Sequence, residues 1–130
     1  MDIHESGEDY LEAILMLQQR TGSVRSIDIA TEMGYSKPTI SIAMRRLREN
    51  GYVEYDEHKD IKLTDRGREV AERIYERHLM LTEVLKSLGI DEKEAVKEAC
   101  KIEHDISADS FDKIKEFYNN MKDTVGTGDP

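Results

Sequence analysis

Hydrophobic residues recur every three or four positions along most of the chain, the spacing that places them on one face of an α-helix. In the first part of the chain this pattern predicts three helices, over residues 6–20, 26–33 and 36–50. Gly34 ends the second helix and Gly51 ends the third, because glycine readily adopts the left-handed conformation that terminates helices. The side chains expected to face inward from the second and third helices are Ile27, Ile29, Ala30, Met33, Ile40, Ala43, Met44 and Leu47.

The pattern changes between residues 52 and 64, where apolar and polar side chains alternate as they do in β-strands. Two strands over residues 52–56 and 60–64 are expected, with residues 57–59 at the tip of the hairpin between them. Gly34 and Tyr35 join the two short helices that come before it, with the length and turn of a helix-turn-helix. A hairpin at this place predicts the wing of a winged helix-turn-helix domain.

Helical periodicity returns after the hairpin and predicts helices over residues 64–88, 92–105 and 108–121. An oxygen-bearing side chain precedes each of the last two helices, where it can accept hydrogen bonds from backbone N–H groups of the first turn. Residues 122–130 lack apolar partners and are expected to form a flexible tail. The side chains expected on the inner face of the last helix are Phe111, Ile114, Phe117 and Tyr118.

The composition restricts the possible functions. The 130 residues carry 28 acidic and 19 basic side chains, which gives a formal net charge of −9. A surface this acidic does not suit indiscriminate binding of nucleic acid, which requires a basic surface. Because the chain has one cysteine, no signal peptide and no long apolar run, we expect a cytoplasmic protein without membrane contact.

The third predicted helix is basic in spite of this acidic background, because lysine and arginine are its only charged residues before Glu49. Hydroxyl groups and a proline ring in its first turns can contact base edges in the major groove, and the arginines further along can hold phosphates. A solvated basic helix face is the alternative interpretation, but the preceding helix and the following wing favour DNA binding. The predicted DNA-binding residues are Ser36, Lys37, Pro38, Thr39, Ser41, Arg45 and Arg46.

Candidate metal ligands occur in the fifth predicted helix. Cys100, Glu103 and His104 stand at positions i, i+3 and i+4, which lie on one helical face. A thiolate, a carboxylate and an imidazole on one face can bind a divalent transition metal. The alternative is a buried structural cysteine beside two solvated polar residues.

Three further residues extend this set to six candidate ligands on three helices. Asp9 and Glu12 stand at i and i+3 on the first helix, and His78 lies midway along the fourth. Each has an ordinary alternative role, because acidic residues near a helix N-terminus interact favourably with the helix dipole and a histidine can simply lie at the surface.

Taken together, these segments resemble the diphtheria-toxin-repressor family of metal-dependent transcriptional regulators, over about residues 6–121. The resemblance implies a mainly α-helical protein, with a winged helix-turn-helix DNA-binding domain over residues 1–72 and a helical metal-binding and dimerisation domain over residues 73–121. It also implies a homodimer that binds a palindromic operator in double-stranded DNA when loaded with metal. The segments that carry the resemblance are Glu8–Glu12, Ser36–Ser41, Leu63–Gly67, Arg77–His78 and Glu98–His104.

The resemblance implies a ligand set, because all six candidate ligands match ligand positions of the family's two-domain, manganese-responsive branch. Cys100 stands where that branch usually has glutamate and is similar in this respect to the iron-responsive branch. That second branch has methionine in place of Asp9, histidine in place of Val96 and a third, SH3-like domain, which we do not expect here. We therefore expect Mn(II) narrowly ahead of Fe(II), with Co(II), Ni(II) or Zn(II) able to bind in vitro.

The predicted function is that of a metal-dependent repressor controlling metal-ion homeostasis, without enzymatic activity and without an organic cofactor. Metal held between the first and fifth helices would fix the orientation in which two recognition helices lie about 34 Å apart, one DNA turn. Ile42 stands where the iron-responsive branch has glutamine, so the operator sequence is left open. The alternatives are a winged-helix regulator controlled by an organic ligand or by oxidation of Cys100, and a metalloenzyme, for which no nucleophile or general base is evident beyond the six ligands.

Overall fold

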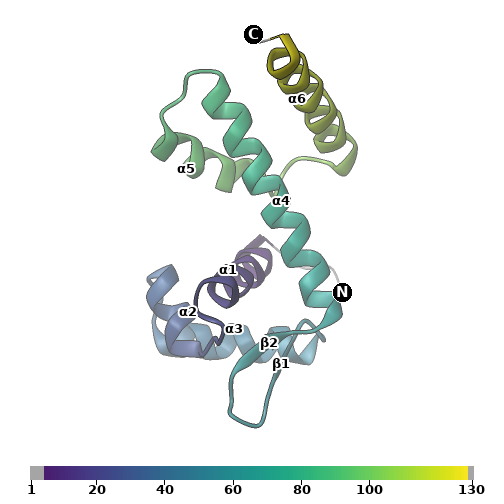
Figure 1. Ribbon diagram of the computed structural model, residues 1–130. Coiled ribbons are helices and arrows are strands. Elements are labelled where there is room, and N and C mark those ends of the chain that lie inside the picture. The colour runs from purple at the N-terminus through teal and green to yellow at the C-terminus, as the bar shows by residue number, and fades with distance from the viewer. Residues whose placement is uncertain (1–4, 129–130) are drawn as a thin grey trace. The chain divides into compact units, whose positions relative to one another are not determined.

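The computed structural model describes residues 5–128, and within them the chain is mainly helical with one small antiparallel sheet (Figure 1). This confirms the predicted fold class. The chain divides into two compact units, the first up to Tyr75 and the second from Glu76 onward, and the division falls inside a continuous helix. The elements are α1 Glu5–Thr21, α2 Ser26–Met33, α3 Lys37–Glu49, β1 Val53–Tyr55, β2 Ile61–Leu63, α4 Asp65–Ser87, α5 Glu92–Ile102 and α6 Ala108–Gly128.

The first unit is built around a hydrophobic core to which α1, α2, α3, both strands and the start of α4 contribute. Leu11, Ile29, Ile40 and Met44 are completely shielded from solvent in this core. Ile27 was expected to join them, but its side chain is 45% exposed, so that prediction was wrong. The reason is helical geometry: residues two positions apart point about 200° apart, so Ile27 and Ile29 cannot share one face of α2.

The two strands form the predicted hairpin, with Val53 opposite Leu63 and Tyr55 opposite Ile61. Each strand is shorter than expected, because the ladder covers only three residues on each side. Asp56 closes the tip, where its carboxylate accepts hydrogen bonds from the backbone N–H groups of residues 58 and 60 at 2.8 and 2.9 Å.

The hairpin is attached to the segment that precedes α2. The N–H of Ile61 donates to the carbonyl of Val24 at 2.7 Å, and the Arg25 guanidinium lies 3.0 Å from Asp60 and 3.3 Å from the carbonyl of His58. The hairpin is therefore held both by its own ladder and by contacts with the loop between α1 and α2.

The second unit contains the later part of α4 together with α5 and α6. Leu81, Ala95, Ala99 and Phe111 are buried there. The segment α5 ends at Ile102, three residues before the expected end at 105. Phe117 was expected on an inner face of α6, but it is 70% exposed in the single chain.

The last helix is longer than expected. It continues to Gly128, whereas the sequence was interpreted as a flexible tail from residue 122. No glycine or proline interrupts residues 109–125, so helical propensity carries the helix beyond the last apolar pattern. Residues 129–130 of the expected tail lie outside the described part of the chain.

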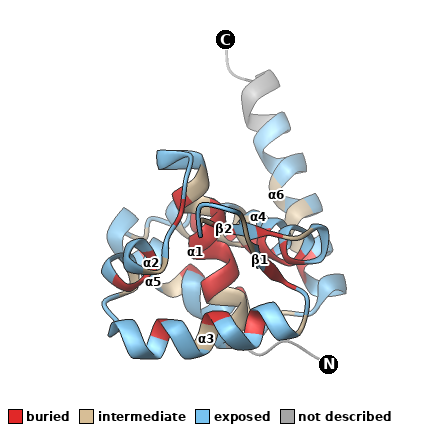
Figure 2. Cartoon of the chain, turned by 90° about the horizontal axis from the view of Figure 1, so that it is seen from below, coloured by how far each residue is buried: buried red, intermediate tan, exposed pale blue. Residues whose placement is uncertain are grey.

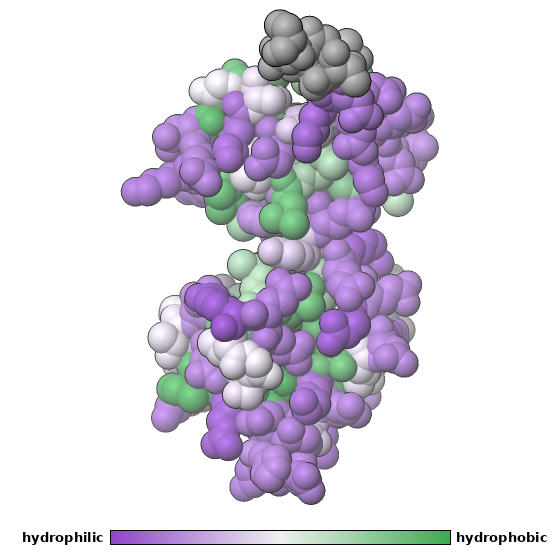
Figure 3. All heavy atoms as spheres, viewed as in Figure 1, coloured by the Kyte–Doolittle hydropathy of each residue, from purple (hydrophilic) through white to green (hydrophobic). Residues whose placement is uncertain are grey.

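Several large hydrophobic side chains of the second unit are exposed, and hydrophobic atoms appear as separate green areas on the mostly hydrophilic surface in Figure 3. None of the helices in the described range is long and apolar enough to cross a lipid bilayer. The exposed hydrophobic residues of the second unit are Leu79, Leu88, Val96, Ile102, Phe117 and Met121.

Gly67, in the first turn of α4, allows a close approach between this helix and the backbone before β1. A Cβ atom at this position would collide with the carbonyl oxygen of Tyr52. Gly67→Ala should therefore lower the free energy of unfolding by about 1–3 kcal/mol, although alanine normally stabilises a helix by about 1 kcal/mol over glycine. Urea denaturation checks this, with Arg68→Ala as a control that should stay within about 0.5 kcal/mol of the unsubstituted protein. A Gly67→Ala protein at least as stable as the original would contradict the proposed collision.

Candidate metal centre and DNA-binding surface

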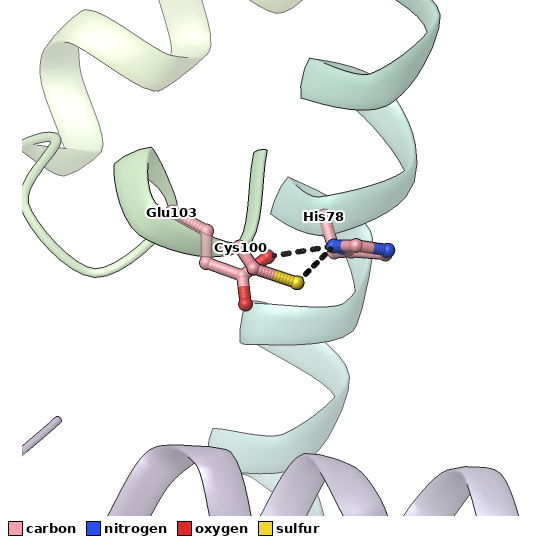
Figure 4. A group of neighbouring side chains, drawn as sticks. All are labelled: His78, Cys100 and Glu103. Atoms are coloured by element: carbon pink, nitrogen blue, oxygen red, sulfur yellow. Dashed lines mark hydrogen bonds and ion pairs between the residues drawn. The ribbon is translucent and has the colours of Figure 1, made fainter. Parts of the chain in front are cut away.

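Three of the predicted ligands come together in the second unit. His78 projects from the middle of α4, and Cys100 and Glu103 project toward it from the end of α5 (Figure 4). His78 Nδ1 lies 3.0 Å from Glu103 Oε2 and 3.6 Å from Cys100 Sγ. One ligand atom from each of the three residues lies within 4.8 Å of the other two, which is a spacing that a single metal ion can bridge.

The end of α5 sets the spacing between its two ligands. Glu103 is the C-cap residue of the helix, yet it keeps helical backbone angles of −57° and −26°, and its N–H donates to the carbonyl of Ala99. The i, i+3 relation between Cys100 and Glu103 therefore holds although the helix ends at Ile102. His104 lies in the following turn, with its side chain 2% exposed and its Nε2 atom 3.5 Å from Glu103 Oε1.

Glu103 is the most deeply buried of the three clustered residues, so its carboxylate has the greatest need for polar or charged partners. Its carboxylate is completely shielded, and its Oε1 atom accepts no hydrogen bond from any described residue. A buried carboxylate oxygen without a donor costs free energy, and a cation is one group that removes that cost. A thiol, an imidazole and a shielded carboxylate are also suitable donors for a divalent transition metal, so the residues fit such an ion.

The histidine of the group is strongly affected by its neighbours. Hydrogen bonding to Cys100, followed by hydrogen bonding to Glu103, raises the pKa of His78 from 6.5 to about 10. The His78 side chain is only 12% exposed, so its proton is held by these neighbours rather than by solvent. While His78 is protonated, its imidazolium charge balances the Glu103 carboxylate, and metal binding through Nδ1 requires loss of the Nδ1 proton.

Asp9 and Glu12 lie on α1 of the first unit, as the sequence indicated. Asp9 is half-buried, and Glu12 is buried with 7% exposure, which is unusual for a glutamate. Their role as ligands stays a prediction, together with that of His104.

Arg77 belongs to the same neighbourhood and was not identified from the sequence as a functional residue. Its Nη1 atom donates to the carbonyl of Glu103 at 3.1 Å and to the carbonyl of Ile106 at 2.8 Å. A signal was present, because Arg77 stands between Ile74 and Leu81 at positions that helical periodicity assigns to the buried face of α4. A charged residue in such a place requires polar partners when it is buried.

The predicted recognition helix, α3, begins as the sequence indicated. Ser36 is its N-cap, with its hydroxyl accepting from the N–H of Thr39 at 3.3 Å, and Pro38 stands in the first turn. Ile40, Met44 and Leu47 bury one side of the helix, so the opposite side faces outward, where most of α3 is pale blue in Figure 2. All seven predicted DNA-binding residues are exposed.

Two further arginines, Arg48 of α3 and Arg66 of α4, lie close to the wing. The Arg48 guanidinium stacks on Tyr55 of β1 at 5.2 Å, and that of Arg66 stacks on Tyr52 at 4.4 Å and donates to the carbonyl of Asn50 at 2.9 Å. Cation–π contacts of this kind hold a guanidinium in one place. The end of α3 and the start of α4 therefore present these two arginines in fixed positions beside the wing.

Two family models match nearly the whole chain. Residues 2–61 match the N-terminal DNA-binding domain of the iron-dependent repressors, and residues 64–128 match their metal-binding and dimerisation domain. The chain belongs to the iron-dependent repressor family. The DNA-binding model covers α3 and most of the wing, and the metal-binding and dimerisation model covers His78, Cys100 and Glu103.

Individual members of the family are similar over most of the chain. An uncharacterised HTH-type transcriptional regulator of Methanocaldococcus jannaschii is 33% identical, over 93% of this chain and 98% of its own length. The HTH-type transcriptional regulator MntR of Bacillus velezensis is 30% identical, over 91% of this chain and 83% of its own length. The solved manganese regulator SloR shares the fold with a TM-score of 0.76 and 27% identity over 92% of this chain. The present chain covers only 55% of the SloR chain.

The cluster makes a spectroscopic prediction. When Co(II) is added, coordination by the Cys100 sulfur should produce a thiolate-to-cobalt charge-transfer absorption in the near ultraviolet, because a soft thiolate is a good ligand for this ion. Cys100→Ser should remove that absorption while the protein stays folded by circular dichroism. An equally intense band in the Cys100→Ser protein would exclude the sulfur from the site.

Proposed function

We propose that this chain is a metal-dependent transcriptional repressor that binds a palindromic operator as a homodimer. The observation that carries the proposal is the shielded Glu103 carboxylate, which is grouped with His78 and Cys100 in one unit of a chain whose other unit exposes a basic recognition helix. The names of the relatives support a transcriptional regulator, and the SloR name supports a response to manganese. An enzymatic role gains no support from these findings.

The proposed ligands are the three clustered residues together with Asp9, Glu12 and His104. A bound divalent cation supplies positive charge that the carboxylates and the thiolate share. We favour Mn(II) over Fe(II), because carboxylates and imidazoles dominate the set, while the single thiolate of Cys100 shifts the preference toward softer ions. Co(II), Ni(II) and Zn(II) are expected to bind in vitro.

The regulation follows from where the ligands stand in the chain. Asp9 and Glu12 belong to the unit that carries α3, whereas Cys100 and Glu103 belong to the other unit. Without a cation the acidic members of this set repel each other, so the DNA-competent arrangement is poorly populated. A 100-fold preference of metal for that arrangement corresponds to about 3 kcal/mol of coupling, which is enough to switch DNA occupancy.

Homodimer formation is part of the proposal. The exposed hydrophobic residues of the second unit, including Leu88 at 72% and Phe117 at 70%, are large side chains that a second copy would cover. A two-fold dimer presents two α3 helices, and a palindromic operator has two half-sites about 34 Å apart to receive them. We propose that Ser36, Thr39 and Ser41 contact bases or phosphates.

Metal dependence is tested with DNA selected from a random library by the manganese-loaded protein. Affinity for that DNA at fixed salt should rise at least tenfold when Mn(II) is added and fall again with chelator, because metal stabilises the competent arrangement. His78→Ala should bind weakly under both conditions. Equal affinities with and without Mn(II) would refute the regulatory proposal.

Phosphate contacts are tested separately through the salt dependence of binding. Arg45→Ala should reduce the slope of log affinity against log salt by about 1, since each phosphate contact releases about one counterion. Lys113→Ala is the matched control, because it removes the same charge from an exposed position on α6. Its slope should equal that of the unsubstituted protein, and an unchanged slope for Arg45→Ala would mean that this arginine does not contact DNA.

A further inference from the structure

Arg77 is a buried cation whose main partners are backbone carbonyl groups. Its side chain is 8% exposed, and its Nη1 atom donates to the carbonyls of Glu103 and Ile106 at 3.1 and 2.8 Å. Its guanidinium carbon also lies 5.6 Å from the centre of the Phe111 ring on α6. One side chain of α4 therefore contacts the end of α5, the turn that follows it and the start of α6.

Burial of the Arg77 guanidinium costs free energy, so specific contacts must compensate for it. Burying a cation costs several kcal/mol unless polar groups compensate, and the Nε atom of Arg77 has no hydrogen-bond partner among the described residues. The compensation comes from the C-terminal end of α5, where carbonyl groups without helical partners carry partial negative charge. The face of the Phe111 ring adds a cation–π attraction.

The contacts of Arg77 and His78 converge on the same residue. These two consecutive residues of α4 both bind Glu103: Arg77 binds its backbone carbonyl, and His78 binds its carboxylate. The carbonyl contact restricts the position of the Glu103 backbone relative to α4. The distance between the His78 imidazole and the Glu103 carboxylate is therefore determined by a main-chain contact as well as by their own side chains.

We propose that Arg77 is the positioning residue of the metal centre: it fixes the turn that carries Glu103 and His104 against α4, and so sets both the affinity for metal and the coordination geometry. The inference rests on the proposed function. Arg77 binds no metal itself, because a guanidinium is always charged and has no lone pair to offer. Its effect is preorganisation, since ligands that are already in place lose less conformational entropy when an ion binds.

The effect expected from losing such a residue is large. Groups that orient the ligands of a metal site typically contribute about 10- to 100-fold to metal affinity. Without Arg77, the carbonyls of Glu103 and Ile106 lose a donor from α4, and the turn between α5 and α6 becomes free to move. A purely structural role for Arg77 makes a different prediction, namely a lower melting temperature with an unchanged site in the protein that remains folded.

The test compares Arg77→Met with Lys115→Met in the full chain. Lys115 also links α6 to α4, through an ion pair with Glu76 at 3.2 Å, but this contact does not involve the turn that carries the ligands. Both substitutions remove one positive charge that connects α4 to another part of the second unit, and only Arg77 contacts the turn that carries the ligands. Mn(II) affinity is measured by calorimetric titration, and Co(II) absorption reports the coordination geometry.

Arg77→Met should bind Mn(II) about 10- to 100-fold more weakly and should change the Co(II) spectrum, whereas Lys115→Met should change neither. Arg77→Lys should recover part of the affinity, because an ammonium group can still donate to one of the two carbonyls. Arg77→Gln, which keeps an N–H donor without the charge, provides a second folded variant if Arg77→Met does not fold.

Two results would overturn the inference, and they differ in what else they overturn. If the folded Arg77 variants match the unsubstituted protein in Mn(II) affinity and Co(II) spectrum, the positioning role is wrong and the proposed function is unaffected. If the unsubstituted protein binds neither Mn(II) nor Co(II), the proposed function fails as well.

Discussion

The central constraint on the second unit is the complete burial of the Glu103 carboxylate, which costs free energy. A carboxylate away from water needs polar or charged partners, and its surroundings supply them: the imidazole of His78 lies 3.0 Å away, and that of His104 lies 3.5 Å away. Arg77 contacts the backbone carbonyl of the same residue. A compact helical unit of this size could have filled the space with leucine. Burying a charge here costs folding free energy, and Glu103 Oε1 still accepts no hydrogen bond from a described residue. This geometry supports the metal-binding interpretation beyond the residue types alone.

The first unit differs, because one side of its helix α3 stays exposed to solvent. Ile40, Met44 and Leu47 anchor α3 to the core, and the polar and basic residues on its other side remain exposed. The whole chain carries a net charge of −9, yet Lys37, Arg45, Arg46 and Arg48 make this helix locally basic, which favours attraction to DNA at this face. An acidic body with one basic face disfavours non-specific binding along a DNA duplex, which agrees with the proposed recognition of one operator.

Much of this could be predicted from the sequence, because the decisive signals were local. Ser36 and Pro38 mark the start of α3, Gly34 and Gly51 mark helix ends, and alternation of apolar residues marks the wing. Ile27 was assigned to the core because it is hydrophobic, although its angular position on α2 differs from that of Ile29. The end of α6 was placed too early, because the sequence there has no residue that stops a helix. Arg77 was missed for a different reason. Helical periodicity placed it on the buried face of α4, but its partners are backbone carbonyls 26 and 29 residues away, which no residue type in the sequence reveals.

The link between Ile61 and Val24 gives the wing an additional property. A hairpin of two three-residue strands would be only marginally ordered by itself. A backbone hydrogen bond connects the second strand of the wing to the loop before α2. Much of the conformational entropy of the wing is therefore already lost when the protein folds. In the proposed complex, a wing that contacts DNA loses little further conformational entropy, so more of the attraction between protein and DNA contributes to affinity.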